Sequence, residues 1–319
     1  MPRSTEVFVV GGGPAGLAAA IAARRRGLDV VVADRSAPAV DKACGEGIMP
    51  DGIAAAAAIG VDLEQAGGHG FNGIRFQEGA VSVAALFPAH HGLGLRRTRL
   101  HRYMTDCAAE VGVHVAWGAR IEGICSDGVR ADGRLVRSRW IIGADGGHSM
   151  VRRWAGLEEF HHDSRRFGYR RHYRIAPWDD FMELHWSDRC QLYVTPIGCE
   201  EVCVALLSRD PRLRLHDALR RFPEIAGRLA AVPESTSERG AVTATRRLRR
   251  VWSGNVALTG DASGSVDAIT GEGLCLLFQQ AHALADALAA GDLARYESAH
   301  RRIGRRPELM AKLMLLLDR

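Results

Sequence analysis

Val7-Phe8-Val9-Val10-Gly11-Gly12-Gly13-Pro14-Ala15-Gly16 places four apolar residues directly before a glycine-rich turn. An apolar run of this length predicts a short buried strand of a parallel sheet. Residues 17–26 are rich in alanine and end in three arginines, which is typical of a helix with cations at its negative end. A second apolar run, 28–33, closes on Asp34. The chain therefore begins with a predicted strand–turn–helix–strand unit.

The glycines of this unit have the G-x-G-x-x-G spacing of dinucleotide-binding turns. Gly11 permits the tight turn, Gly13 lets the backbone approach a pyrophosphate, and Gly16 lets the helix pack on the strand. The helix N-terminus favours phosphate, and Asp34 is placed to bind ribose hydroxyls. The candidate nucleotide-binding residues are Gly11, Gly13, Pro14, Ala15, Gly16, Asp34 and Arg35. The unit alone leaves FAD and NAD(P) both open.

Composition excludes several classes of protein. The 319 residues are 47% hydrophobic and 25% charged, as in globular proteins of about two domains. The net charge is +5, and the arginine clusters lack the interleaved aromatics of a nucleic-acid surface. The seven cysteines form no C-x-x-C pair, so we predict no metal site, no disulfide framework and a cytoplasmic location. We find no signal peptide and no apolar run of the roughly 20 residues that span a bilayer.

Two further strands are predicted to end in glycine–aspartate turns, at Asp145-Gly146 and at Gly260-Asp261. Residues 74–87 and 167–207 have a different pattern, since they are strand-like and broken by Pro and Gly, which favours an antiparallel sheet. The predicted domains are a discontinuous nucleotide-binding domain and an inserted sheet domain that binds the substrate. The first comprises residues 1–70, 92–160 and 250–319, and the second comprises 71–91 and 161–249.

The three turn motifs, taken in this order, resemble the fingerprints of the flavoprotein superfamily that contains p-hydroxybenzoate hydroxylase and the geranylgeranyl reductases. The third motif includes Thr270-Gly271-Glu272-Gly273. The resemblance implies an α/β fold with a Rossmann-like FAD-binding domain of glutathione-reductase type, an inserted antiparallel sheet, and FAD as cofactor. It also implies that Asp261 contacts the ribityl chain and that Arg99 reaches the cofactor, although His101 stands where the family usually has Asp. By the same resemblance, Asp145-Gly146 lies near both FAD and the incoming NAD(P)H.

The segment Cys44-Gly45-Glu46 resembles the part of the reductase branch that passes the flavin. The helix expected from Leu274 would point its positive end at the reduced ring and stabilise the negative charge there. These motifs add the following cofactor candidates: Cys44, Gly45, Arg99, Asp145, Gly146, Gly260, Asp261, Thr270, Gly271, Glu272, Gly273 and Leu274.

The catalytic residues are not identified by any motif, and the candidates are Cys44, Tyr193 and Thr270. The reductase branch typically has Tyr-x-Trp-x-Phe-Pro where this chain has Tyr193-Val194-Thr195-Pro196. The hydroxylases usually have a proline just before the turn at Thr270, which is missing here. Halogenases of this superfamily normally carry a Trp-x-Trp-x-Ile-Pro motif and a catalytic lysine. Here the motif is absent and the only lysines are Lys42 and Lys312.

The function expected from these features is that of an FAD-dependent monooxygenase using NAD(P)H and O2 on a hydrophobic small molecule, free or held on a carrier protein. Two alternatives stay open: a C=C double-bond reductase of geranylgeranyl-reductase type, and a flavin-binding protein without turnover. The arginines of residues 246–250 predict a basic strand edge, or a site for a 2′-phosphate or an acidic carrier. Residues 303–317 predict a basic amphipathic helix that packs on the body or lies on a membrane surface.

Overall fold

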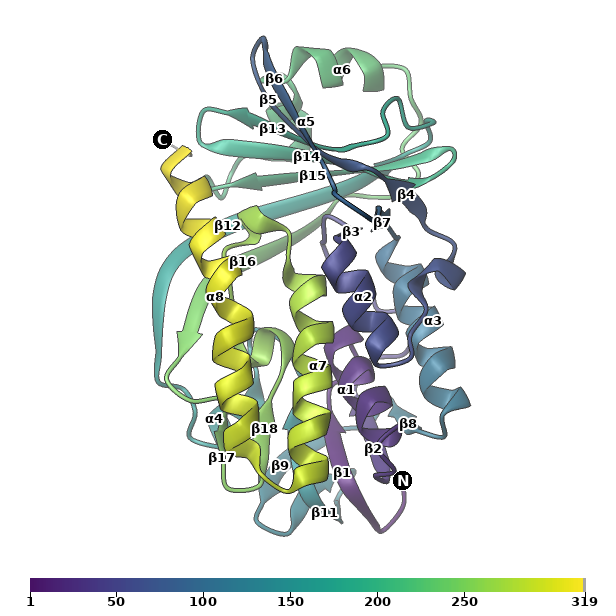
Figure 1. Cartoon of the computed structure of the whole chain (residues 1–319), viewed down its shortest axis with the longest axis vertical. Coiled ribbons are helices and arrows are strands. Elements are labelled where there is room, and N and C mark those ends of the chain that lie inside the picture. The colour runs from purple at the N-terminus through teal and green to yellow at the C-terminus, as the bar shows by residue number, and fades with distance from the viewer. Residues whose placement is uncertain (318–319) are drawn as a thin grey trace.

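The computed structural model describes residues 1–317, apart from the side chains of 162, 163 and 317, and consists of two sheets joined by helices (Figure 1). The lower sheet has the strand order β17-β18-β11-β1-β2-β8, and its central strands are parallel. Its strands are β1 (Ser4–Val10), β2 (Val30–Asp34), β8 (His114–Trp117), β9 (Ile121–Cys125), β10 (Gly128–Ala131), β11 (Arg134–Gly143), β17 (Trp252–Ser253) and β18 (Val256–Leu258).

Helices cover one face of this sheet, and a smaller apolar cluster with the β9–β10 hairpin and α4 covers the other. The helices on the first face are α1 (Pro14–Arg24), α2 (Pro50–Ala58), α3 (Arg97–Glu110), α7 (Gly273–Ala290) and α8 (Leu293–Leu317), while α4 (Met150–Trp154) lies on the other. The 3-10 turns are η1 (Leu63–Ala66), η2 (Gly260–Ser263) and η3 (Ala268–Thr270). The predicted strand–turn–helix–strand unit at the N-terminus is confirmed as β1–α1–β2. The alanines of α1 let this helix lie close against the sheet. The described helices include none that is long and apolar enough to cross a bilayer.

The upper sheet has the order β19-β16-β12-β15-β14-β13-β5-β6. Its strands are β5 (Gly73–Glu78), β6 (Val81–Leu86), β12 (Phe160–Tyr173), β13 (Met182–Ser187), β14 (Cys190–Gly198), β15 (Glu201–Ser208), β16 (Arg239–Leu248) and β19 (Gly264–Ser265). Its outer face packs on α5 (Leu215–Leu219) and α6 (Pro223–Leu229). One expectation is corrected: the sheet is not wholly antiparallel, since β13 runs parallel to β5, which belongs to an earlier part of the chain.

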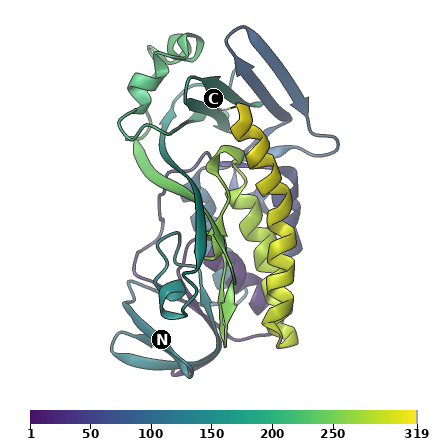
Figure 2. The same ribbon diagram turned by 90° about the vertical axis from the view of Figure 1, so that its left-hand side faces the viewer.

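Two features join the sheets. In Figure 2 the long strands β12 and β16 extend downward beside the lower half, opposite α8. The short strand β19, which follows Asp261 in the lower half, pairs with β16 through Arg246 and Arg247. A small sheet of β3 (Gly47–Ile48), β7 (Gly92–Gly94) and β4 (His69–Phe71) lies between the halves. The predicted α/β fold is confirmed, while the domain boundaries drawn from the sequence stay a proposal.

Candidate functional site: three glycine turns and the loops beside them

The glycine turn between β1 and α1 is shaped by close backbone contacts. A Cβ atom on Gly16 would lie 1.8 Å from the Gly11 carbonyl oxygen, and one on Gly11 would lie 2.4 Å from the Ala144 oxygen. A Cβ on Gly13 would meet no atom within 4 Å, so the space beside this residue is open. Gly13 is the N-cap of α1, and no side chain caps the helix. The first amides of α1 are therefore available to an anion.

Asp34 and His101 hold this turn in place. The Asp34 carboxylate accepts hydrogen bonds from the backbone N–H groups of Gly12 and Ser36, each at 2.7 Å. Nε2 of His101 lies 2.9 Å from the Gly12 carbonyl oxygen, which can only accept. His101 is buried, and desolvation lowers its pKa, so a neutral ring donates this bond. This residue, found in the sequence only as a departure from the family, supports the turn from α3.

In the turn at Asp145-Gly146, the Asp145 carboxylate forms hydrogen bonds with residues that follow it directly in the chain. The Asp145 carboxylate accepts from the backbone N–H groups of Met150 at 2.7 Å and Val151 at 3.1 Å, and from the Ser149 hydroxyl. Asp145 therefore anchors the start of α4, which satisfies free amide groups at a helix start. Gly146 has φ +83° and open space beside it, so the backbone at this position can be approached closely. We propose that the backbone at Gly146, and not the carboxylate of Asp145, borders the cofactor.

The role expected of Arg99 stays a prediction, and the neighbouring Arg97 offers an alternative. Its guanidinium is exposed and donates to the Gly67 carbonyl at 2.8 Å. Arg97, at the start of α3, lies close enough to Cys44, His101 and Asp261 to act on the pKa of each. The Arg97 Nε is buried and has no hydrogen-bond partner. Successive helix residues are about 100° apart, so Arg97 and Arg99 point to nearly opposite sides. Because Arg97 acts on these three groups, we propose it as the arginine that contacts the cofactor.

Asp261 lies in the turn after β18 and pairs with Lys42 of segment 41–47, with Nζ 2.9 Å from Oδ2. Both side chains are about half exposed. Burial of the Asp261 carboxyl raises its pKa, but Lys42 and Arg97 outweigh this and hold the pKa below its usual value. The preceding Gly260 amide donates to Gln280 of α7 at 2.8 Å. Asp261 is thus an ionised acceptor on a fixed turn.

Segment 41–47, which the resemblance places beside the flavin, is attached to the upper sheet. Thr195 of β14 donates to the Gly45 carbonyl at 2.8 Å. Glu46 has φ +62° and its buried carboxylate lies 2.7 Å from Nε2 of His172 on β12. The same carboxylate accepts from the backbone N–H of Arg97 at 3.0 Å. One side chain therefore connects the segment, α3 and the sheet.

Glu46, His172 and Cys203 bring three metal-ligating atoms within 4.8 Å of one another. Arg170 Nε is 3.9 Å from the Glu46 carboxylate, and its guanidinium also pairs with Asp41. A fixed guanidinium already supplies the positive charge that the carboxylate needs, so we interpret the cluster as an ion-pair network. Burial raises the pKa of both the Cys44 and the Cys203 thiols, which keeps them protonated.

The loop from Asp267 to Gly273 is held by the same sheet face. Arg166 of β12 pairs with Asp267 at 2.9 Å, and both side chains are only 1% exposed. The Tyr193 hydroxyl donates to the Ile269 carbonyl at 2.6 Å, and the Thr270 hydroxyl donates to the Asp267 carbonyl at 3.2 Å. Tyr193 and Thr270, both catalytic candidates from the sequence, therefore donate to backbone carbonyls of this loop.

Gly271, Glu272 and Gly273 form the entrance to α7, whose next residue, Leu274, is buried in the core. Added Cβ atoms on either glycine would meet nothing within 4 Å. Burial and the nearby Asp51 raise the pKa of Glu272, whose Oε2 is buried with no hydrogen-bond partner. The positive end of α7 thus faces open space, as a site for a planar or anionic group requires.

Beside this loop lies an apolar cluster that combines Phe71, Met182, Leu184 and Leu207 with Tyr193 and Ile269. The sheet residues among them, Met182, Leu184, Tyr193 and Leu207, lie on the face turned toward the lower half, opposite to the face that α5 and α6 cover. Met49 packs against the cluster from the segment after Gly47, and Met314 packs against it from α8. A hydrophobic ligand at this position would meet both loops.

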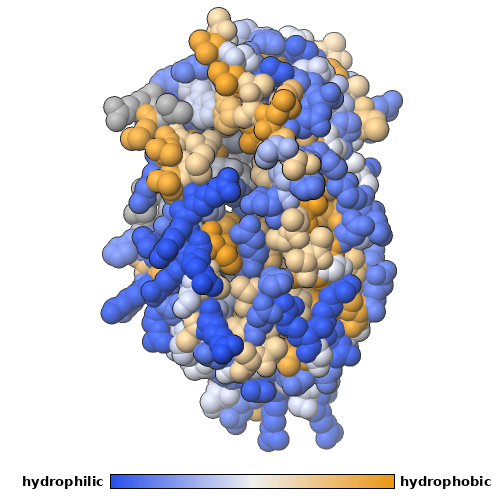
Figure 3. Space-filling model, viewed as in Figure 1, coloured by the Kyte–Doolittle hydropathy of each residue, from blue (hydrophilic) through white to orange (hydrophobic). Residues whose placement is uncertain are grey.

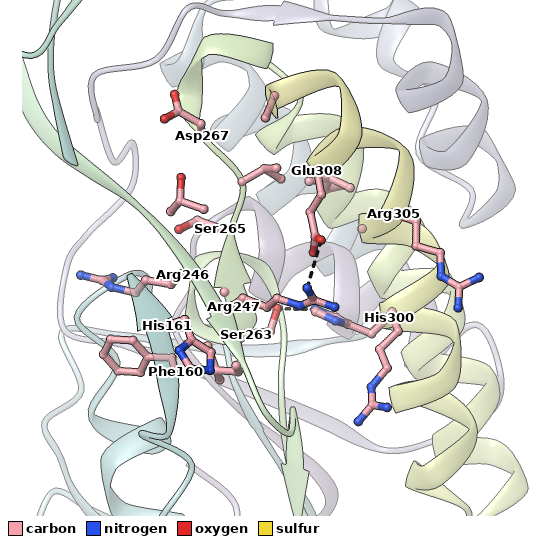
Figure 4. A pocket seen from close by; sticks show the side chains of 18 of the residues that line it. Phe160, His161, Arg246, Arg247, Ser263, Ser265, Asp267, His300, Arg305 and Glu308 are labelled. Carbon is pink, nitrogen blue, oxygen red and sulfur yellow. Dashed lines mark hydrogen bonds and ion pairs between the residues drawn. The ribbon is translucent and has the colours of Figure 1, made fainter. Parts of the chain in front are cut away.

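A separate cavity of about 1190 Å³ lies between β16 and α8 (Figure 4). Its lining includes six Arg and Lys residues but three acids, so its walls are basic; the cations are Arg246, Arg247, Arg249, Arg301, Arg305 and Lys312. Arg246 also donates to the carbonyl of Gly147, next to the turn at Gly146. Figure 4 shows the ion pair from Arg247 to Glu308 and the hydrogen bond from Ser263 to His300 across this cavity. From the sequence, Arg246, Arg247 and Arg249 were predicted to form a basic strand edge. The structure shows that they line a cavity.

The arrangement fits FAD. An extended dinucleotide needs amide donors at its pyrophosphate, acceptors at its hydroxyls and a close approach at its ring. The uncapped N-terminus of α1 offers the amide donors, the ionised Asp261 offers an acceptor, and the open glycines before α7 allow the close approach. Arg97, His101 and Glu272 each carry a buried polar atom without a hydrogen-bond partner, which a bound cofactor can satisfy.

Residues 4–181 match the family model described as "FAD binding domain". The chain belongs to this FAD-binding family. The superfamily expected from the three motifs is confirmed, and the protein is an FAD-dependent oxidoreductase. This FAD-binding chain is 29% identical to a menaquinone reductase of Mycobacterium tuberculosis, over 92% of this chain and 78% of the relative. It is 37% identical to the 6-methylpretetramide 4-monooxygenase of Streptomyces rimosus, over 48% of this chain and 41% of that enzyme.

Solved structures of this FAD-binding fold are also similar. A triple mutant of the flavin-dependent brominase Bmp2 superposes with a TM-score of 0.84 at 17% identity, covering 97% of this chain and 87% of the brominase. A geranylgeranyl bacteriochlorophyll reductase-like protein of Thermoplasma acidophilum gives 0.82 at 20% identity, with coverage of 97% and 87%. At these identities the likeness supports the fold alone.

Proposed function

We propose that the protein is an FAD-dependent monooxygenase that uses NAD(P)H and O2 to oxygenate a hydrophobic small molecule. The observation that supports this most is the apolar cluster beside the loop from Asp267 to Gly273. Oxygen transfer needs a pocket from which water is excluded, and the cluster offers Phe71, Met182 and Leu184 at that position. Bound FAD would supply the electron transfer and the activation of O2.

The chain's own residues would position the reactants. The amides at the start of α1 and the Asp261 carboxylate would hold the cofactor, with Arg97 beside them. The sheet would hold both loops through Thr195, Tyr193 and Arg166, and this fixes the distance between cofactor and substrate. A placement error of 1 Å can cost about 100-fold in rate, so such rigid support matters.

NAD(P)H is proposed as the reductant, and the basic cavity supports it. Arg246 and Arg247 line this cavity, and Arg246 bonds to the carbonyl of Gly147 beside the open backbone of Gly146. A phosphate-bearing nucleotide is attracted by such a wall. Replacing Arg247 by Gln is expected to raise the KM for NAD(P)H several-fold and to leave FAD binding unchanged. Arg134→Gln, on the β10–β11 hairpin, is the matched control.

The test uses the FAD-loaded protein with NADH or NADPH, a panel of hydrophobic phenols, and a prenylated quinone. The expected result is substrate-dependent O2 uptake and one atom of ¹⁸O from ¹⁸O2 in the product. Full product yield without oxygen would contradict monooxygenation.

Reduction of a C=C bond is the second candidate function. It is favoured by the two kinds of relatives that align along nine-tenths of the chain, the menaquinone reductase above and a geranylgeranyl diphosphate reductase of Oryza sativa at 26% identity over 91% of the chain. In the same assay this function predicts anaerobic turnover of the prenylated quinone with a mass gain of two hydrogens.

A further inference from the structure

The last four turns of α8 carry an outward stripe that changes from basic to apolar along the helix. Arg302 and Arg306 begin the stripe, and Leu309, Leu313 and Leu316 continue it at spacings of three and four residues. Residues at such spacings lie on one side of a helix. All five side chains are exposed, and the leucines are 58%, 49% and 58% exposed. The helix does not bury this face against the body, although sequence reasoning favoured that.

A second exposed apolar group lies at the same end of the molecule. Val81, Val83 and Leu86 of the edge strand β6 are 67%, 60% and 70% exposed. Figures 1 and 2 both place the β5–β6 hairpin and the end of α8 at the upper end of the molecule. In Figure 3 the hydrophobic end of α8 stands above a hydrophilic patch. Exposed aliphatic side chains on two elements at one end are unusual for a surface that meets only water.

The charges around the stripe have one sign. From residue 301 to 316 the chain has four arginines, one lysine and a single acid, Glu308, which pairs with Arg247. Within the described part of the chain, Arg302 and Arg306 form no ion pair. A self-complementary contact between two copies would need acids opposite these arginines, and the stripe offers none. An anionic surface would complement them.

The dimensions match a lipid headgroup layer. Leu309 to Leu316 spans about 10 Å along the helix axis at 1.5 Å per residue, so entry by the end of the helix would carry all three leucines into the headgroup region. With the leucines at that depth, Arg302 and Arg306 lie one to two turns nearer the water, where phosphates are found. Met314, on the inward side of the same turns, packs against the cluster of Leu184 and Ile269. The stripe is therefore next to the proposed substrate site.

We propose that the end of α8, assisted by the β5–β6 hairpin, docks the protein on an anionic lipid bilayer. A hydrophobic substrate dissolved in that bilayer would then reach the apolar cluster without crossing water. The docking itself does not depend on which redox reaction the FAD site performs.

The proposal is tested by flotation of the FAD-loaded full chain with vesicles of phosphatidylcholine alone or with about one-third phosphatidylglycerol. We expect binding to the anionic vesicles at low salt and weaker binding at high salt. Leu309→Gln, Leu313→Gln and Leu316→Gln together should lower the affinity at least about 100-fold. Arg302→Gln with Arg306→Gln should lower it about 25-fold, at roughly a factor of five per arginine.

The matched control replaces residues at the opposite end, Arg134→Gln, Leu135→Gln and Arg137→Gln, which are also exposed. It should bind as the unchanged protein does. Thermal melting and retained flavin absorbance confirm that each variant is folded. Absence of the unchanged protein from the anionic vesicles would overturn the proposal. So would a dimer in light scattering that the leucine variant converts to a monomer, because the stripe would then join two copies.

Discussion

The segment between β18 and α7 carries two aspartates that form ion pairs in opposite surroundings. Asp267 pairs with Arg166 at 2.9 Å and both side chains are 1% exposed, whereas Asp261 pairs with Lys42 at the same distance with exposures of 48% and 52%. Removing one partner of a buried pair leaves an uncompensated charge, while an exposed pair contributes little. The buried pair therefore fixes the loop on the sheet, and the exposed pair can open so that Asp261 meets a cofactor hydroxyl.

The largest effect is expected at the buried pair. Asp267→Ala should destabilise the protein by about 3–5 kcal/mol, because Arg166 keeps its charge in a site that water does not reach. Urea unfolding measures this change. Arg166→Met with Asp267→Leu is the control, since removing both charges should restore much of the loss. A loss below about 1 kcal/mol in the single variant would mean that the pair is no more important than the exposed one.

The contact from α8 to the same segment predicts a pH dependence. Burial lowers the pKa of His300 to about 4, from the ordinary value near 6.5, and its Nε2 lies 2.8 Å from the Ser263 hydroxyl. The unfolded chain therefore takes up a proton between pH 6.5 and 4 that the folded chain refuses, so stability falls as the pH falls through this window. We expect a loss of about 2 kcal/mol, read from urea midpoints at pH 7 and 4.5. His300→Gln should flatten the dependence; an unchanged slope would assign it to other groups.

Arg97 and Arg99 extend the comparison to cofactor binding. Arg97→Ala should weaken FAD binding about tenfold, because its guanidinium acts on Asp261 and its buried Nε has no hydrogen-bond partner. Arg99→Ala, at an exposed position, should change it less than twofold. Flavin fluorescence titration of the apoprotein measures both. Equal losses in the two variants would refute the assignment of Arg97.

A single neutral hydrogen bond should have a smaller effect. Tyr193→Phe removes the donor to the Ile269 carbonyl and should cost about 1–2 kcal/mol, since a buried acceptor is left unpaired. If Tyr193 only positions the loop, the pH profile of turnover should keep its shape while kcat falls. A shifted profile would instead give Tyr193 a role in proton transfer.

The smallest effect is expected at the exposed pair. Lys42→Met should change the free energy of unfolding by less than about 1 kcal/mol, because solvent screens both charges. Thermal unfolding at low and high salt is the measurement. A loss comparable with that of Asp267→Ala would show that exposure does not separate the two pairs.

The sequence predicted the features that depend on local pattern. The unit from Val7 to Asp34 follows from glycine spacing and apolar runs, and the strand ends at Gly146 and Gly260 follow in the same way. For two residues, the local contacts in the structure favour a different role from the one predicted, and neither role has been tested. Four arginines lie within seven residues at the start of α3, and a shift of two residues separates Arg97 from Arg99 by about 200°. Asp145 was assigned to the cofactor, but the helix that starts at Met150 uses its carboxylate.

The supporting contacts could not be predicted, because they join distant parts of the chain. Glu46 meets His172 across 126 residues, and Arg166 meets Asp267 across 101. In the sequence, Arg166 and Arg170 are each one of several cations in a basic strand. Only the register of β12 against β15 turns Arg170 and His172 inward together. The sequence offered one signal for such contacts, which is a polar residue at a position where the alternation of polar and apolar residues in the strand predicts burial.

The pairing of β19 with β16 has a consequence for exchanging parts between relatives. Gly264 and Ser265 pair with a strand of the upper sheet, and Glu46 and Asp267 form ion pairs with residues on its inner face. One structural unit therefore comprises the sheet, residues 41–47 and residues 263–270. A chimaera that takes only the sheet from a relative would lack the residues that form ion pairs with Glu46 and Asp267. Transferring all three segments together should preserve FAD binding while changing the substrate that is bound.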